Sequence, residues 1–230
     1  MAKYAYLLFN IAVGSSLVFA AVWVPAFWRQ WRGTVRGLAL VSVPFIIWDA
    51  LAAQAGHWQF SQAYTLGINA WGLPLEEILF FVTVPLGCMV VWVQLGRVSN
   101  ATKPLMAIKH AHWLLVSAVP ILVGLAVLSE TPSYTRLALL AAAITCIILS
   151  WHRRLVVSRR FVVFQLCSFA LFLVCNTILT GLPIITYSDQ AVLGWRIGTI
   201  PVEDFLYNFA LLNLFLVAYV GGGRPASKSG

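Results

Sequence analysis

The acidic residues of this chain are few, and four of the seven occur as two adjacent pairs. Glu76 and Glu77 form one pair, Glu203 and Asp204 form the other, and each pair begins two positions after a proline. Proline fits the first turn of a helix, so both pairs are expected at helix starts. Carboxyl groups there either stabilise the unpaired N–H groups of the helix or serve as general acids and bases. The repetition favours a function, although duplication would copy a structural cap equally well.

The surroundings of these acids must be lipid rather than water. Hydrophobic residues make up 61% of the 230 residues and charged residues 10%, against roughly 25% charged in an average soluble domain. The formal charge is +8 and the isoelectric point is near 9.7. The basic residues nevertheless lie in short runs between long apolar stretches, as in the loops of membrane proteins. We therefore expect membrane lipids as partners and no nucleic acid.

Seven apolar stretches are long enough, or nearly so, to cross a bilayer as helices of about 20 residues. The first, from Tyr4 to Trp28, contains no charged residue and is too long for a signal peptide, so we expect it to be retained. The sequence predicts an all-α, polytopic membrane protein with spans at 4–27, 37–55, 75–96, 112–129, 135–151, 161–181 and 202–220.

The basic residues also predict an orientation, because cytoplasmic loops carry an excess of lysine and arginine. Three lie in one set of connections, namely Lys3, Arg136 and Arg196. Twelve lie in the opposite set, namely Arg29, Arg32, Arg36, Arg97, Lys103, Lys109, Arg153, Arg154, Arg159, Arg160, Arg224 and Lys228. The protein is therefore expected in the cell membrane, with its N-terminus outside the cell and its C-terminus in the cytoplasm.

An internal repeat relates the two acidic pairs. Residues 74–80 recur at 201–207 with a shift of 127, and the same shift takes Asp49 to Asn176. Because four helices separate the copies, the two three-helix repeats are parallel and should be related by a pseudo-two-fold axis along the membrane normal. The expected division is a first repeat at 1–111, a connector helix and loop at 112–133, a second repeat at 134–222 and a cytoplasmic tail at 223–230.

The repeat predicts a polar layer within the membrane. Asp49 lies about six residues, or roughly 9 Å, before the end of its span, so it can share a depth with the first pair. Asn176 would lie beside the second pair in the same way. Apolar surroundings and neighbouring acids both favour the protonated form of a carboxyl group. Such a group is a proton donor at neutral pH.

Helix geometry distinguishes the two members of each pair. Adjacent residues point about 100° apart, so one of Glu76 and Glu77 can exchange a proton while the other stabilises the helix start. Phe80 and Tyr207, four residues after Glu76 and Glu203, are expected on the same helix faces as those acids. Aromatic faces can stabilise a carbocation, whereas contact with lipid or packing is the ordinary role of a single aromatic residue in a chain with 13% aromatics.

Both motifs resemble the signature of the membrane-embedded lycopene cyclases, which occur either as two small subunits or as one fused chain. The matching residues are Pro74, Glu76 and Glu77 followed by Phe80 and Phe81, and Pro201-Val202-Glu203-Asp204-Phe205. The resemblance covers nearly the whole chain in its fused form. It implies a carotenoid end-group cyclase that converts lycopene, taken from the bilayer, to β-carotene through γ-carotene by non-redox acid–base chemistry.

The resemblance also implies site residues. Glu76 or Glu77 and Glu203 or Asp204 would divide the acid and base roles. Substrate-binding or supporting residues would be Asp49, Asn176, Phe80, Phe81, Tyr207 and Asn208. No cofactor is expected, because the chain lacks the G-x-G-x-x-G motif of dinucleotide sites, and no metal site is expected. We favour one composite site between the halves over two separate sites.

Other classes of membrane protein require residues at positions that differ from those in this chain. A retinal protein needs a lysine within a helix, whereas all four lysines fall in loops or tails. A prenyltransferase needs separated aspartate-rich motifs for Mg²⁺ and a diphosphate, whereas these acids are adjacent. A proton-coupled transporter and a cyclase for longer C50 carotenoids remain alternatives. The sequence leaves the ring type and the oligomeric state open.

Overall fold

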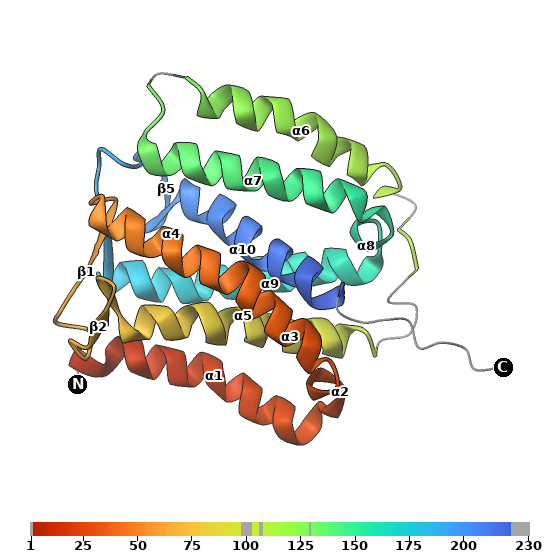
Figure 1. Ribbon diagram of the computed structural model, residues 1–230, viewed down its shortest axis with the longest axis horizontal. Coiled ribbons are helices and arrows are strands. Elements are labelled where there is room, and N and C mark those ends of the chain that lie inside the picture. The colour runs from red at the N-terminus through yellow and green to blue at the C-terminus, as the bar shows by residue number, and fades with distance from the viewer. Residues whose placement is uncertain (1, 98–102, 106–107, 129, 222–230) are drawn as a thin grey trace.

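The computed structural model of the chain describes residues 2–97, 103–105, 108–128 and 130–221 (Figure 1). The predicted tail at 223–230, with Arg224 and Lys228, lies outside the described residues. The helices are a 3₁₀ turn Ala2–Tyr4, α1 Ala5–Trp23, α2 Pro25–Trp28, α3 Trp31–Gly37, α4 Val43–Gln54, α5 Leu75–Leu95, α6 Ala111–Ala126, α7 Ser133–Trp151, α8 Arg153–Val156, α9 Arg159–Gly181 and α10 Val202–Val220. The strands are β1 Trp58–Phe60, β2 Asn69–Ala70, β3 Leu73–Pro74, β4 Ile185–Tyr187, β5 Arg196–Ile197 and β6 Ile200–Pro201.

The chain is an all-α, polytopic membrane protein, as predicted. Within the described ranges, six helical segments are long and apolar enough to cross a membrane: Ala2–Ala20, Trp31–Gln54, Leu75–Leu95, Ser133–Trp151, Arg159–Gly181 and Val202–Val220. The predicted span at 112–129 is shorter than expected. Its helix α6 has 16 residues, about 24 Å at 1.5 Å per residue, against a hydrocarbon core of about 30 Å.

The second span begins six residues earlier than predicted. A π-helical turn, Leu38–Ser42, joins α3 to α4, so one continuous helix runs from Trp31 to Gln54. Pro44 follows this turn and has no N–H group to close an ordinary helical bond, which explains the wider turn. Arg32 and Arg36 therefore lie within the helix and not in a loop.

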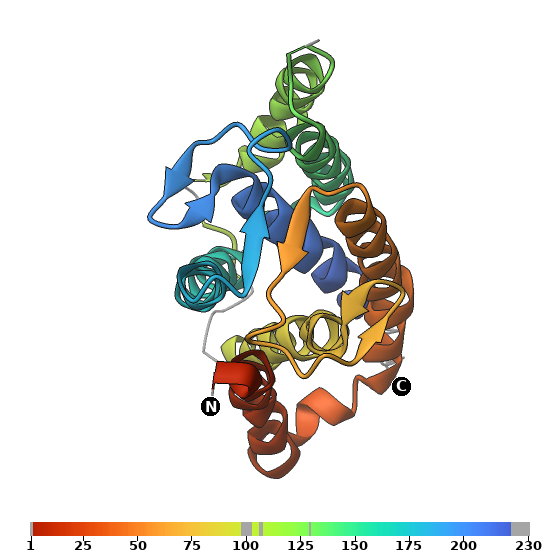
Figure 2. The ribbon, with the colours of Figure 1, turned by 90° about the vertical axis from the view of Figure 1, so that its left-hand side faces the viewer.

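The long helices run side by side, and all six strands lie at the end of the bundle that also holds the N-terminus (Figure 1). We call this the strand end. Strand β1 pairs with β4 antiparallel and joins the two halves of the chain, with Trp58 opposite Tyr187. Strands β2 and β3 form one hairpin, and β5 and β6 form another. Seen from this end, α10 lies inside the bundle and α6 lies at its margin (Figure 2).

Two glycines allow α3 to approach α10 closely. A Cβ atom on Gly33 would lie 2.3 Å from the backbone oxygen of Tyr219, and one on Gly37 would lie 2.5 Å from the ring of Phe215. Both contacts are shorter than van der Waals packing permits, so α3 and α10 meet backbone to backbone. Phe215 and Tyr219 belong to the buried core that α10 forms with α5 and α9.

We predict that Gly33→Ala destabilises the protein, because the new methyl group meets a backbone oxygen that cannot rotate away. Overpacking of this kind costs about 1–3 kcal/mol, so the Tm of the detergent-solubilised protein should fall. Gly124→Ala in α6 is the matched control, since its Cβ would meet nothing within 4 Å and alanine favours a helix. An equal Tm for both variants would contradict the close contact.

Candidate active site

A cavity of about 510 Å³ lies between α1, α4, α5, α7, α9 and α10, beneath the strand end. Three carboxyl groups reach it from three helices: Asp49 from α4, Glu77 from α5 and Asp204 from α10. The rest of the wall is mainly apolar and aromatic. The two repeats therefore contribute carboxyl groups to one shared cavity.

Glu77 is held by the first helix. The hydroxyl of Tyr6 donates to Oε2 of Glu77 over 2.5 Å. Helix α1 is fixed against α5 by Asn10, whose amide donates to the backbone oxygen of Glu76 over 2.9 Å and whose Oδ1 accepts from Thr83 over 3.0 Å. The phenol of Tyr6 is therefore positioned by contacts independent of the carboxyl group that it binds.

Asp204 accepts three hydrogen bonds from three different elements. Tyr134 of α7 donates to Oδ1 over 2.7 Å, while Asn176 of α9 and Tyr187 of β4 donate to Oδ2 over 2.8 and 2.7 Å. Burial and the neighbouring carboxyl group of Asp204 raise the pKa of Tyr187 well above its ordinary value, so this phenol keeps its proton and remains a donor. Asn176 thus lies beside the second acidic pair, where the repeat predicted it.

Asp49 has a different environment. Its side chain is 3% exposed, next to the indole of Trp58, and its Oδ2 has no hydrogen-bond partner among the described residues. The hydroxyl of Tyr207, on the cavity wall, is also buried without a partner there. An ionised carboxylate needs donors in such a place, and a protonated one needs fewer.

The first member of each pair does not line the cavity. Oε1 of Glu76 accepts the backbone N–H of Leu66, and Oε1 of Glu203 accepts that of Leu193, each over 2.7 Å. The two contacts differ by the same shift of 127. Each of these two acids therefore stabilises, through a hydrogen bond, the loop that precedes its own helix. They do not accept the N–H groups of the helix start, as the capping interpretation expected, because each side chain turns back towards the loop.

The matched loops share further detail. The N–H of Leu75 donates to the oxygen of Ile68, and the N–H of Val202 donates to that of Trp195, again at the repeat shift. Gly67 and Gly194 have φ of +82° and +80°, a conformation that side chains with a Cβ adopt rarely. This backbone requirement accounts for a glycine at both positions.

The predicted aromatic and amide residues Phe80, Phe81, Tyr207 and Asn208 all line the cavity. Their partners differ from the prediction. Phe80 and Tyr207 share the cavity with Glu77 and Asp204, three residues before them, and not with the acids four residues before them. Spacings of three and four both bring residues to one helix face, and the sequence did not decide between them.

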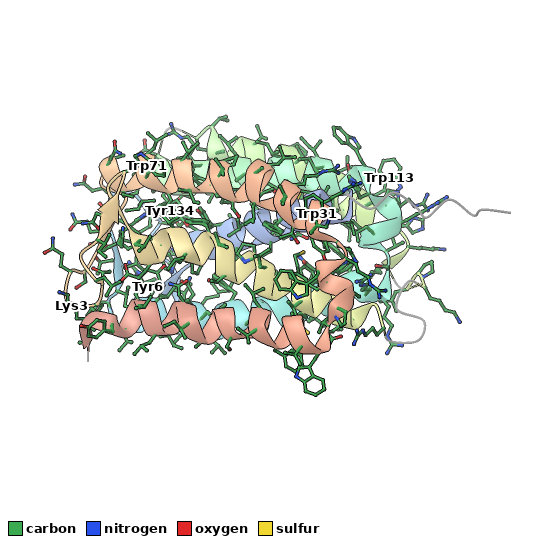
Figure 3. All side chains as sticks on the ribbon, turned by 60° about the horizontal axis from the view of Figure 1, so that its bottom comes forward. Lys3, Tyr6, Trp31, Trp71, Trp113 and Tyr134 are labelled. Carbon is green, nitrogen blue, oxygen red and sulfur yellow. The ribbon has the colours of Figure 1, made fainter. Side chains whose placement is uncertain are left out.

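Sequence analysis missed Tyr6, Tyr134 and Tyr187. Figure 3 shows Tyr6 and Tyr134 near the strand end, on helices far apart in the chain. Tyr6 and Tyr134 are 128 residues apart, one position off the repeat shift, so alignment of the motifs did not pair them. The signal that could have found Tyr6 and Tyr134 is a tyrosine hydroxyl group in the first turn of each of two matched spans. Tyr187 lies on strand β4 and has no such signal.

The lycopene cyclase family model matches residues 3–95 and 131–220, which together make up most of the chain and include both acidic pairs. The chain belongs to the lycopene cyclase family. Searches of curated proteins and of solved structures returned no match. The resemblance inferred from the two motifs is therefore confirmed. This lycopene cyclase homologue is therefore a carotenoid cyclase. It is a membrane enzyme of carotenoid biosynthesis.

The loop contacts of the lycopene cyclase homologue give a prediction. Glu203→Ala removes the acceptor for the N–H of Leu193 and for the hydroxyl of Thr135, so the loop at 188–199 should lose protection against hydrogen–deuterium exchange. A hydrogen bond of this kind contributes about 0.5–1.5 kcal/mol. Glu203→Gln keeps an oxygen acceptor and should retain most of the protection. Unchanged exchange in Glu203→Ala would contradict the structural role.

Proposed function

We propose that the chain is a lycopene β-cyclase, which converts lycopene through γ-carotene to β-carotene by an intramolecular, redox-neutral reaction. One observation carries the proposal: Glu77 and Asp204, the second acids of the two repeated motifs, face one mainly apolar cavity. An apolar cavity suits a hydrocarbon end group. Two carboxyl groups from different helices would supply a proton donor and a proton acceptor without any cofactor.

The proposed reaction has three steps. One carboxyl group transfers its proton to the terminal double bond, which forms a C–H bond and leaves a tertiary carbocation. The next double bond along the chain attacks this cation and closes a six-membered ring, which moves the cation into the ring. The other carboxylate then removes a proton beside the new cation, and the C–H electron pair becomes the ring double bond.

The walls of the cavity suit a cationic intermediate. The rings of Phe80, Phe81 and Tyr207 line it, and aromatic faces attract cations. Water would trap the cation as an alcohol, so the site must be dry. Trp58 of β1 and Tyr187 of β4 lie on the cavity wall at the strand end, so the β1–β4 pair separates the reacting carbons from the aqueous side.

We propose that one composite site serves both ends of the substrate in turn. The carboxyl groups of the two halves lie in the same cavity. The hydrogen-bond donors around Glu77 differ from those around Asp204. Asp49 of the first half corresponds to Asn176 of the second, and only Asn176 binds its neighbouring acid directly. The monocyclic product would leave the cavity and present its open end for the second cyclisation.

The substrate would enter from the bilayer between α1 and α9. The more exposed residues of the cavity wall lie on these two helices: Ala12 on α1, and Leu171 and Ile178 on α9, which are 45% and 42% exposed. Helix α1 packs against α5, and α5 packs against α9; in the end view α1 and α9 lie apart (Figure 2). A long hydrocarbon can therefore place its end at the carboxyl groups while the remainder stays in lipid.

The strand end would face the outside of the membrane. Lys3 lies there (Figure 3), whereas α2, α8 and the N-terminal half of the span Trp31–Gln54, which carry Arg32, Arg36, Arg153 and Arg154 in or beside them, lie towards the opposite end (Figure 1). The positive-inside rule then orients the N-terminus outward and the end of α10 towards the cytoplasm. The carboxyl groups of the cavity would lie in the outer half of the bilayer.

Replacement of the cavity acids should abolish cyclisation. In a lycopene-producing bacterium, we expect Glu77→Gln and Asp204→Asn to reduce ring formation by about 10²–10⁴-fold, the typical contribution of a general acid or base. Glu76→Gln and Glu203→Gln keep their oxygen acceptors for the loop N–H groups, so they should retain most of the activity. Pigments would be separated by chromatography, and protein amounts compared by immunoblot. Full conversion by both cavity variants would refute the proposed chemistry.

A bulky residue at the lateral opening should slow substrate entry. We expect Leu171→Trp to lower the initial rate of lycopene conversion several-fold, because the larger ring narrows the space between α9 and α1. Leu173→Trp on the same helix is the matched control. Leu173 is 39% exposed but does not line the cavity, so that variant should convert lycopene at the parent rate. Equal rates for the two variants would exclude this route.

A further inference from the structure

The two cavity carboxyl groups that come from the repeated motifs differ in their hydrogen bonds. Asp204 accepts three and Glu77 accepts one. We infer that Glu77 is the acid and Asp204 is the base, and that the donors around Asp204 are positioning residues that keep it ionised. The names acid and base rest on the proposed function, whereas the underlying protonation states are properties of the chain alone.

The donors around Asp204 are suited to an anion. Each hydrogen bond to a charged carboxylate favours that form over the neutral one. Tyr134 binds one oxygen, and Asn176 and Tyr187 bind the other. None of these donors carries a charge, so they solvate the negative charge without cancelling it. The carboxylate therefore keeps its ability to accept a proton from a cation.

Glu77 lacks such support. Its Oε2 accepts from Tyr6, and no hydrogen bond reaches Oε1 from the part of the chain that the structure describes. A protonated carboxyl group can accept at one oxygen and carry its proton on the other. Oε1 of Glu77 is thus the position from which a proton can be delivered into the cavity.

The charge balance of the cavity leads to the same assignment. Its titratable groups are Asp49 from α4, Glu77 from α5, Asp204 from α10 with Glu203 beside it, the phenols of Tyr6, Tyr134, Tyr187 and Tyr207, and the thiols of Cys88 and Cys175. The wall contains no Lys, Arg or His among the described residues. Several anions close together without a cation are costly in an apolar site. One negative charge is therefore expected, and the best-solvated group, Asp204, carries it.

The assignment gives a balanced cycle. The O–H bond of Glu77 breaks as a C–H bond forms on the less substituted carbon of the terminal double bond, which leaves the tertiary cation on the other carbon. After ring closure a ring C–H bond breaks, its electrons form the double bond, and its proton goes to Asp204. Glu77 then carries the negative charge and Asp204 the proton. Net transfer of one proton from Asp204 to Glu77 restores the starting state, without any oxidant or reductant.

Infrared spectroscopy of the reconstituted parent protein at neutral pH tests the assignment without substrate. A protonated carboxyl group has a C=O band separate from that of a carboxylate. We expect Glu77→Gln to remove one such band and Asp204→Asn to remove none. Loss of a protonated band in Asp204→Asn, or no loss in Glu77→Gln, would overturn the inference. Labelling the parent with ¹³C-carboxyl glutamate should shift a protonated-carboxyl band, and the absence of any shifted band would contradict a protonated Glu77 even if a variant fails to fold.

The positioning residues are tested by the same signal. Tyr187→Phe removes one donor from Asp204, so a new protonated-carboxyl band should appear and should vanish again in Tyr187→Phe/Asp204→Asn. Cyclisation should slow roughly tenfold. Tyr219→Phe is the matched control, because Tyr219 is buried, its hydroxyl has no partner among the described residues, and it does not line the cavity. A slower Tyr187→Phe variant without the new band would mean a merely structural role and would overturn this part.

The two proposals can fail separately. An inactive parent protein with a protonated Glu77 and an ionised Asp204 would remove the cyclase proposal and leave the protonation assignment intact. An active cyclase with the opposite protonation states would remove only the assignment.

Discussion

A carboxyl group within the thickness of a bilayer must receive its hydrogen bonds from the protein, because lipid supplies none. The donors to Asp204 come from three elements, α7, α9 and the strand β4 that follows α9. Glu77 likewise binds α1 to α5 through Tyr6. The polar layer thus joins the helices around the cavity, and the chemistry and the local packing depend on the same contacts.

The two halves have kept one function of the acidic pair and altered the other. Glu76 and Glu203 make the same contact to the preceding loop at 2.7 Å, because both hairpins need the same support. The second acids differ in their number of donors, and their neighbours differ as Asp49 and Asn176. In the proposed reaction one carboxyl group is protonated while the other is ionised, and unequal numbers of donors favour such a difference. The different surroundings of Glu77 and Asp204 in the two otherwise matching repeats provide this difference.

The sequence predicted the spans, the repeat and the neighbourhood of Asn176, since these depend on hydropathy and on fixed spacing. It did not predict which acid of each pair faces the cavity. In a helix that is apolar on every side, hydrophobic periodicity does not define the inner face. The contribution of Tyr187 depends on the pairing of β1 with β4 across more than 120 residues, and no local pattern encodes it.

In the proposed reaction, separate elements would control access to the cavity from lipid and from water. Helices α1 and α9 carry the exposed wall residues, whereas the β1–β4 pair covers the strand end with Trp58 and Tyr187. Because Tyr187 also donates to Asp204, any opening of this cover would remove a donor from the carboxylate at the moment that water entered. In the proposed reaction, a wet site would therefore also have a weakened preference for the ionised base. Tyr187 would therefore link the exclusion of water from the cavity to the ionised state of Asp204. The proposed reaction would then proceed only while the β1–β4 pair covers the cavity.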